Sequence, residues 1–182
     1  MSETDKTALL VMDVQPGIVD RLEDPEAYLA SVNTVIEAAH ARQLPVIYVV
    51  VGFRTGLPEV SRRNRSFSAI KESGAERMVN PSPAIEPAAG DVVVTKRRVS
   101  AFTGSDLEVV LRAHDIRHLV LTGIATSGVV LSTVREAADK DYQLTVLSDL
   151  SADLDDEVQR VLTEKVFPRQ AEVITAKEWL NQ

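Results

Sequence analysis

The sequence predicts an α/β fold, a three-layer α/β/α domain with an open, mostly parallel sheet of six strands. Short β-branched or apolar runs recur along the chain, and each is followed by a segment with the apolar spacing of a helix. Most of the runs are apolar on both faces, as strands covered by helices on both sides must be. The chain of 182 residues has the size of one domain with one core, so we expect a single domain over residues 1–182.

Six segments have the composition of buried strands. They are short, and polar or turn-forming residues bound them. The expected strands are Ala8–Asp13, Pro45–Val51, Asp91–Thr95, His118–Thr122, Leu144–Ser148 and Glu172–Ile174. Right-handed crossovers between them would build a doubly wound, Rossmann-like sheet.

The segments between these strands have helical periodicity. In the longest of them, one apolar stripe is formed by Leu29, Val32, Val35, Ile36 and Ala39. The expected helices are Pro25–Ala41, Ser105–His114, Ser127–Lys140, Asp155–Lys165 and Ala176–Leu180.

The stretch from Gly52 to Gly90 departs from this alternation. It contains prolines at positions 58, 81, 83 and 87 and several arginines, and only Ser66–Glu72 has the spacing of a helix. A connection of this length in a compact domain usually forms a lid, a binding loop or an oligomer contact. We therefore expect a loop-rich insertion at about residues 52–90.

Composition narrows the class of function. The formal net charge of −7 provides no positive field for a nucleic acid, and the basic cluster of Arg62, Arg63 and Arg65 is local. The absence of cysteine excludes disulfides and thiol nucleophiles. The first residues lack the pattern of a signal peptide, and no apolar run has the length of a membrane span. We expect a cytoplasmic protein with no nucleic-acid or membrane partner.

Polar residues follow three of the expected strands, where open α/β sheets bind ligands. Asp13 ends the first strand, Lys96 follows the third, and Gly123–Gly128 follows the fourth. A carboxylate beside an ammonium group in a dry pocket can hold and move protons. The alternative is an aspartate that caps the following turn and a lysine that pairs with it for structural reasons.

The segment after the fourth strand begins a helix. Thr126 or Ser127 can cap this helix, which would leave backbone N–H groups free to face an anion. The alternative is an ordinary glycine-containing turn between a strand and a helix.

Together these segments resemble the isochorismatase-like hydrolase superfamily, the cysteine hydrolase family of isochorismatases, nicotinamidases and N-carbamoyl amidases. The similarity runs from about Thr7 to Trp179. Its most specific pieces are Asp13-Val-Gln15, Lys96-Arg-Arg98-Val-Ser100-Ala-Phe102, Gly123-Ile-Ala-Thr-Ser-Gly-Val129-Val and Val146-Leu-Ser-Asp149. The resemblance also implies a non-proline cis peptide, at Ile124–Ala125.

The resemblance to the amidase branch implies a catalytic triad at Asp13, Lys96 and Val129. In that branch the third position is a nucleophilic cysteine, and a valine cannot attack a carbonyl carbon. Thr126 or Ser127 as a substitute nucleophile is a further alternative, although no histidine or second base is evident nearby to activate a hydroxyl.

Nicotinamidases carry a metal motif after the second strand, and here that place reads Gly52-Phe53-Arg54. His40, His114 and His118 lie far from it in the sequence, on helical or flanking segments. We therefore expect no metal and no cofactor.

True isochorismatases cleave an enol ether and need no thiol, because their aspartate protonates the vinyl carbon. The run from Lys96 to Phe102 and the Ser127-Gly128 turn look more like this branch. However, Gly123-Ile-Ala-Thr lacks the aromatic and histidine pair that isochorismatases usually have there, which leaves the substrate open.

The resulting hypothesis is a hydrolase of a small anionic molecule in which Asp13 moves a proton and Lys96 holds it. Backbone N–H groups near Gly128 and Val129 would face the developing charge. The expected substrate-binding residues are Gln15, Arg54, Arg98, Phe102, Ile124, Ala125, Thr126, Ser127 and Gly128. An arginine among them, or one of Arg62, Arg63 and Arg65, could pair with a carboxylate. Solvated loop charge is the alternative for each arginine, and a core position is the alternative for Phe102.

A second hypothesis is a catalytically inactive family member that binds a ligand or mediates assembly. An inactive protein would not need to retain both Asp13 and Lys96. The presence of both residues therefore favours the enzyme hypothesis. The resemblance also implies a homo-oligomer, a dimer or a tetramer.

Overall fold

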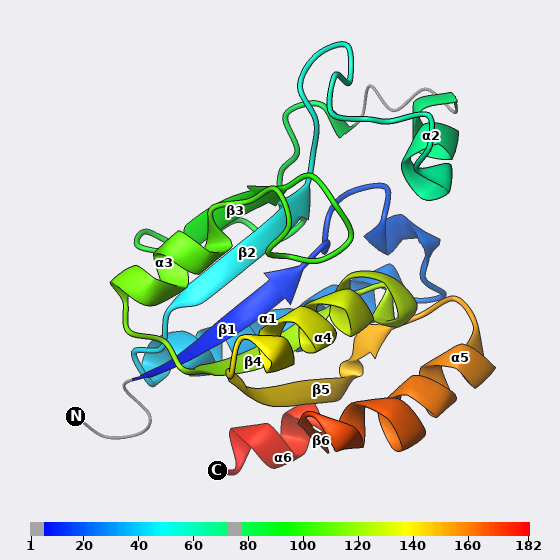
Figure 1. The fold of residues 1–182 in the computed structure, drawn as a ribbon. Helices are drawn as coiled ribbons and strands as arrows, with labels where there is room; N and C mark the ends of the chain where they lie inside the picture. The colour runs from blue at the N-terminus through cyan, green and yellow to red at the C-terminus, as the bar shows by residue number, and fades with distance from the viewer. Residues whose placement is uncertain (1–5, 73–77) are drawn as a thin grey trace.

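The computed structural model describes residues 6–72 and 78–182, and its centre is one parallel sheet (Figure 1). The strands are β1 (Thr7–Met12), β2 (Val46–Val51), β3 (Val92–Lys96), β4 (His118–Ile124), β5 (Gln143–Ala152) and β6 (Glu172–Ile174). Their order across the sheet is β3-β2-β1-β4-β5-β6, and all neighbours are parallel. The predicted α/β class is confirmed.

The helices follow the predicted segments; α1 and α6 have the predicted ends, and the other helices have shifted ends. They are α1 (Pro25–Ala41), α2 (Arg65–Glu72), α3 (Leu107–Ala113), α4 (Leu131–Asp139), α5 (Asp156–Val161) and α6 (Ala176–Leu180). Two π-helical turns, Thr126–Val130 and Leu162–Val166, precede α4 and follow α5. Two 3₁₀ turns, Val19–Arg21 and Phe167–Arg169, were not predicted.

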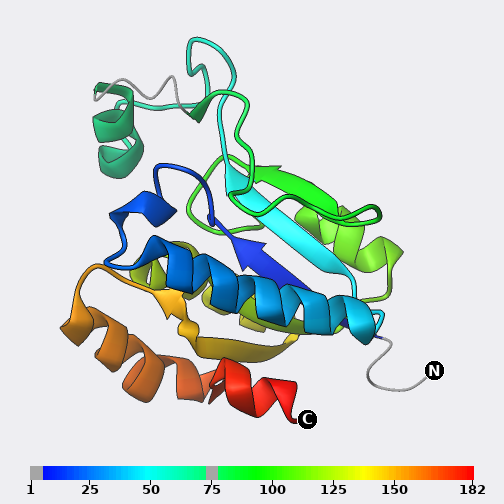
Figure 2. The ribbon, with the colours of Figure 1, turned by 180° about the vertical axis from the view of Figure 1, so that it is seen from behind.

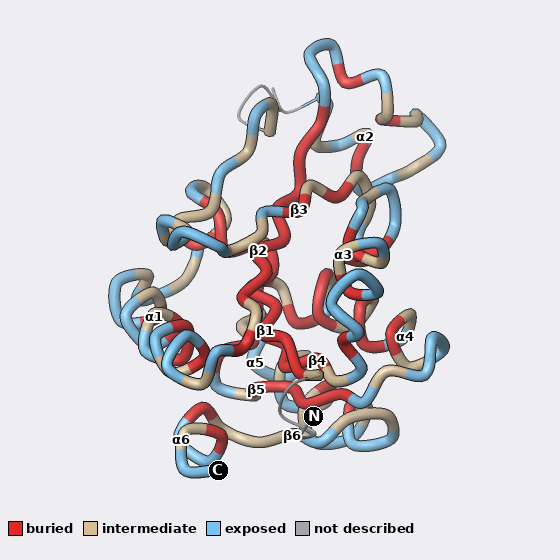
Figure 3. The backbone as a smooth tube through the Cα atoms, turned by 90° about the vertical axis from the view of Figure 1, so that its left-hand side faces the viewer, coloured by how far each residue is buried: buried red, intermediate tan, exposed pale blue. Residues whose placement is uncertain are grey.

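Two layers of helices cover the sheet, as Figures 1 and 2 show from opposite sides. Alternate side chains of β1 enter different cores, because successive residues of a strand point to opposite faces. Leu9 and Val11 pack with residues of α1 and α6, whereas Leu10 and Met12 pack with residues of α3 and α4. The central strands are therefore buried on both faces, as Figure 3 shows.

The order in which strands are added to the sheet reverses between β1 and β4. From β1 the chain builds β2 and β3 outward on one side, and then crosses back to place β4 on the other side of β1. The loops after β1 and β4 diverge from adjacent strands, which opens a crevice at their carboxyl ends. The peptide bond Ile124–Ala125 at the end of β4 is cis, as the family resemblance implies.

The connection from β2 to β3 contributes a third, smaller apolar cluster. This cluster is centred on Phe53, Leu57, Val60 and Phe67, and α2 supplies the last of these side chains. Figure 1 shows α2 standing apart from the sheet, beyond the strand ends. The helix predicted at Ser66–Glu72 is confirmed and begins one residue earlier, at Arg65.

Within residues 6–72 and 78–182, no helix is both long enough and apolar enough to cross a bilayer.

The close approach of β4 to β1 depends on Gly123. This residue has φ +154°, and a Cβ atom placed on it would lie 2.3 Å from the Met12 carbonyl oxygen. The adjacent strand leaves no room for that atom, because the obstacle is backbone. Gly128, five residues further on, would place a Cβ only 3.9 Å from the Ala125 Cβ, which is ordinary contact.

We expect Gly123→Ala to lower the free energy of unfolding by about 3 kcal/mol, since it adds backbone strain and overpacking. Gly128→Ala is the matched control, and we expect it to be neutral or stabilising by up to about 1 kcal/mol, because alanine favours a helix. Urea unfolding monitored by circular dichroism measures both values. Equal midpoints for the two variants would contradict the packing described here.

Candidate active site

Asp13 leaves β1 in a left-handed backbone conformation, with φ +56°. Aspartate tolerates this conformation better than most residues. Its backbone N–H donates to the Val49 carbonyl oxygen at 2.8 Å, so the turn remains anchored to β2. The strand therefore ends at Met12, and Asp13 presents its carboxyl group at the crevice between β1 and β4.

Lys96, the last residue of β3, forms an ion pair with Asp13. The Nζ atom lies 2.9 Å from Asp13 Oδ2, and only 2% of the lysine side chain and 9% of the aspartate side chain are exposed. The ammonium group also donates to the carbonyl oxygens of Arg98 at 2.9 Å and Val99 at 3.0 Å. These three acceptors match the three N–H donors of an ammonium group, so Lys96 has none left for a ligand.

The second carboxyl oxygen of Asp13 is in a different situation. Oδ1 is buried and has no hydrogen-bond partner among the described residues. Burial raises the pKa of Asp13 to about 6, because it disfavours the charged form more strongly than the neighbouring Lys96 ammonium stabilises it. At mildly acidic to neutral pH this carboxyl group can therefore both hold a proton and release one.

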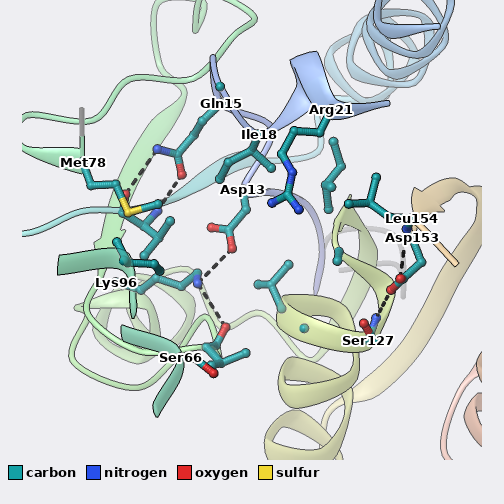
Figure 4. Close-up of a pocket in the computed structure, with 18 of the residues that line it drawn as sticks. Asp13, Gln15, Ile18, Arg21, Ser66, Met78, Lys96, Ser127, Asp153 and Leu154 are labelled. Atoms are coloured by element: carbon teal, nitrogen blue, oxygen red, sulfur yellow. Dashed lines mark hydrogen bonds and ion pairs between the residues drawn. The ribbon is translucent and has the colours of Figure 1, made fainter. Parts of the chain in front are cut away.

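The carboxyl group lies at a cavity of about 450 Å³, shown in Figure 4. The ends of β1 and β3 supply Asp13 and Lys96 to its lining, and the π-helical turn after β4 supplies Val129. Phe67 and Ile70 of α2 also line it. Much of the lining is apolar, which keeps water scarce around the ion pair. The three residues predicted as a triad are thus brought to one cavity, and their catalytic roles stay predictions.

The start of the helix after β4 is capped differently from the prediction. Neither Thr126 nor Ser127 caps it with a side chain. Instead, the Ser127 N–H donates to Asp153 Oδ2 at 2.7 Å, and the Gly128 N–H donates to the Ala125 carbonyl oxygen at 3.0 Å. The expectation of a free N–H is therefore wrong for Gly128, because an internal acceptor already occupies this donor, and it stays a prediction for Val129.

Five of the nine residues expected to bind substrate line the cavity with Val129: Gln15, Ile124, Ala125, Ser127 and Gly128. The amide group of Gln15, however, is held by the end of β2. Its Nε2 donates to the Val51 carbonyl oxygen at 3.2 Å, and its Oε1 accepts from the Val51 N–H at 2.7 Å. Gln15 therefore fixes the spacing of β1 and β2 beside the ion pair.

The other four lie outside the cavity lining. Arg98 donates to the Glu59 carbonyl oxygen at 3.0 Å and lies over the Phe67 ring, because residues 97–99 turn away from β3. Arg54 forms an exposed ion pair with Glu59 at 2.5 Å. These arginines support the segment 52–90, and the structure places neither where it would meet a ligand in this cavity.

Phe102 and Thr126 are buried elsewhere. Phe102 belongs to the main core and packs on Tyr142 with ring centroids 6.0 Å apart, which is the core position left open as its alternative. Thr126 is fully buried, and its Oγ1 has no partner among the described residues. A hydroxyl outside the cavity is poorly placed as a substitute nucleophile.

The cavity also contains charged residues that the sequence reasoning missed, Arg21 and Asp153. Arg21 ends the 3₁₀ turn Val19–Arg21, and Figure 4 shows its guanidinium group in the same space as the Asp13 carboxyl group. Asp153 follows β5, and its carboxylate lies at the start of the helix. A three-residue turn has no periodicity to detect, so only the proximity of Arg21 to Asp13 in the sequence could have indicated it.

The described residues contain no group of three or more His, Cys, Asp or Glu side chains that could hold a metal ion. His40 pairs with Asp91 at 2.8 Å, and His114 contacts the Val110 carbonyl oxygen. His118 is half-buried at the start of β4, and burial lowers its pKa.

Comparisons with known proteins agree with the family resemblance found in the sequence. The isochorismatase domain model matches residues 7–178. The isochorismatase family protein YwoC of Bacillus subtilis is 31% identical over 181 residues, which cover 97% of this chain and 94% of YwoC. The ureidoacrylate amidohydrolase RutB of Stutzerimonas stutzeri is 28% identical over 172 residues, 79% of this chain and 68% of RutB. N-carbamoylsarcosine amidase from Thermoplasma acidophilum has a similar structure, with a TM-score of 0.74, 29% identity and coverage of 94% and 96% of the two chains.

We expect the Asp13 carboxyl group to titrate with a pKa of about 6, measured by the ¹³C chemical shift of its Cγ. Replacing Lys96 by methionine should raise this pKa further, because the ammonium group opposes the effect of burial. Lys140→Met is the matched control, since Lys140 is exposed and pairs with Glu108.

The same shift predicts how stability depends on pH. A raised pKa in the folded state means that the contribution of Asp13 to stability is complete below about 4 and is lost as the pH rises through about 6. A carboxyl group that titrates near 4 in the native protein would show that burial does not dominate at this site.

Proposed function

Because this chain belongs to the isochorismatase family of hydrolases, we propose that it hydrolyses a small anionic substrate by proton transfer at Asp13, without a nucleophilic side chain. One observation carries the proposal: Asp13 has one carboxyl oxygen bound to Lys96 and the other buried without a partner at a cavity. A carboxyl group held in this way has a fixed orientation, and one of its oxygens has no protein donor to compete with proton exchange.

Protonation of an enol ether fits this group. The neutral Asp13 carboxyl group transfers its proton to the terminal vinyl carbon, and the carbon that bears the ether oxygen becomes an oxocarbenium centre. The resulting Asp13 carboxylate is stabilised by Lys96, 2.9 Å away. Water adds to the cationic centre and returns a proton to the site. The hemiketal then breaks down to a ketone and an alcohol.

Acyl transfer fits the site less well. That reaction needs a nucleophile, and the cavity has a valine at position 129 where the family resemblance places a cysteine. Ser127 lines the cavity, but the described part of the lining contains no histidine to activate its hydroxyl group. The amidohydrolase names of two relatives keep an amide substrate as the second candidate.

We expect Asp13→Asn to lower kcat/KM by about a thousandfold, because asparagine keeps the shape of the side chain and cannot supply the proton. The probe is 2-(cyclohexyloxy)acrylate, a carboxylated vinyl ether whose hydrolysis releases pyruvate, which a coupled lactate dehydrogenase assay measures. Asp139→Asn is the matched control, because Asp139 is exposed at the end of α4.

The wild-type rate should fall as the pH rises above about 6, since the acid form of Asp13 is required. An active wild-type enzyme that Asp13→Asn leaves unchanged would refute the mechanism. A protein that binds the probe and hydrolyses neither it nor the amide N-carbamoylglycine would instead be a binding module.

Position 129 gives an independent test. We expect Val129→Cys to keep vinyl ether hydrolysis within about threefold of wild type, because the proton path runs through Asp13. The new thiol shares the cavity with the free oxygen of Asp13, so we also expect slow hydrolysis of N-carbamoylglycine through an acyl-enzyme detectable by mass spectrometry. Val129→Thr, which has the shape of valine and no thiol, should form no such adduct. Complete loss of vinyl ether hydrolysis in both variants would place position 129 in the reaction itself.

A further inference from the structure

We infer that Arg21 selects a substrate with one carboxylate by binding that group, and that Asp153 excludes a second anion from the start of the helix after β4. The inference rests on the proposed function only in placing the substrate in this cavity. It concerns binding, and it can be tested without turnover.

Two cationic side chains line the described part of the cavity, Arg21 and Lys96. The Lys96 ammonium group has its donors taken by Asp13 and by two backbone carbonyl oxygens. The Arg21 guanidinium group has no acceptor among the described residues, and Figure 4 shows it reaching toward the space beside Asp13. Of these two cations, Arg21 is therefore the one that has donors available, and its planar group matches a carboxylate.

The backbone that carries Arg21 is well defined. The Arg21 N–H donates to the Ile18 carbonyl oxygen at 3.2 Å, and the Gly17 N–H donates to Asp20 Oδ2 at 2.8 Å. Val19, in the same turn, is buried against the core beside α1. Arg21 itself is an exposed residue, so its charge is partly screened by water. We therefore expect a moderate effect on affinity.

The lining also carries a negative charge at the start of the helix after β4. Asp153 accepts the Ser127 N–H through Oδ2 at 2.7 Å and the Leu154 N–H through Oδ1 at 2.9 Å. The anion-binding position at the start of this helix is thus filled by a carboxylate of the protein itself. A ligand carboxylate placed there would meet a like charge and would find the Ser127 donor occupied.

Large apolar side chains also line this cavity. Ile18, Phe67 and Leu154 line the cavity, and Leu154 is 54% exposed although it is a large apolar residue. A cavity of about 450 Å³ accommodates a small organic molecule. The arrangement favours a ligand with an apolar body and one carboxylate directed at Arg21.

The test is equilibrium binding by isothermal titration calorimetry at pH 7.5 with three probes of similar size: benzoate, benzamide and phthalate. We expect the wild-type protein to bind benzoate at least tenfold more tightly than benzamide. Arg21→Gln should bring the affinities for benzoate and benzamide within about twofold of each other and leave the affinity for benzamide unchanged. Arg21→Lys should keep part of the preference for benzoate. Arg62→Gln is the matched control, because Arg62 is exposed and outside the lining.

Asp153→Asn tests the second half of the inference. Asparagine keeps an oxygen that can accept the Ser127 N–H and removes the charge, so we expect phthalate to gain about fivefold in affinity relative to benzoate. An unchanged ratio would refute the exclusion of a second anion. Wild-type affinity for benzoate no higher than for benzamide, or a preference that survives Arg21→Gln, would refute the role of Arg21.

The outcome is separable from that of the proposed reaction. Asp13→Asn should keep the preference for benzoate over benzamide, because Arg21 and Asp153 are unchanged. Loss of vinyl ether turnover with an intact carboxylate preference would support both proposals. A carboxylate preference in a protein whose turnover does not depend on Asp13 would leave only the role of Arg21 standing.

Discussion

The buried ion pair between Asp13 and Lys96 is the interaction on which the site depends. Two opposing effects act on the Asp13 carboxyl group. Exclusion of water favours its neutral form, and the ammonium group 2.9 Å away favours its charged form. The first effect is the larger, and it leaves the pKa of the carboxyl group at about 6. The result is a group that can exchange a proton near neutral pH in a cavity that is largely apolar.

The sheet supplies the geometry of this pair. Asp13 and Lys96 come from β1 and β3, which are separated by β2, so their side chains must converge over the end of the intervening strand. Gln15 holds β1 to the last residue of β2, and Val51 is in register with Lys96. A shift of one residue in either pairing would point the lysine to the opposite face. The hydrogen bonds of the parallel sheet therefore define the distance between the two charges.

The part of the site that could be predicted from the sequence is the part governed by strands. A run of apolar residues that ends in Asp13, and another that ends beside Lys96, suffices to place both at one edge of a parallel sheet. Arg98 could not be placed in this way, because the chain leaves β3 and turns its side chain toward Glu59. Arg21 was missed for a related reason, since it lies on a three-residue turn whose direction depends on tertiary contacts.

The helix start illustrates the same limit. The residues at 126–128 have the composition of a self-capped helix, but the cap comes from Asp153 in another loop, 26 residues away in the sequence. Local propensity favours a cap, and tertiary structure decides which side chain provides it. The long connection at 52–90 was recognised as irregular by its prolines, and its described part adds α2 over the cavity, which no local pattern could specify.

The energetics of the ion pair favour a chemical role over a structural one. Burying two charges requires removing both from water, and apolar residues of similar volume are often equally stabilising or better. The raised pKa of Asp13 indicates that Lys96 does not fully offset this desolvation, so the ionised carboxylate lowers stability at neutral pH. Val129, 98% buried from solvent in the same lining, adds to the dry surroundings that produce this shift. A thiolate at position 129 would be a second anion in the same cavity lining. Because valine is uncharged, the exclusion of water remains the dominant influence on the pKa of Asp13. Valine at position 129, which supplies no nucleophile, thus also favours retention of a proton on Asp13.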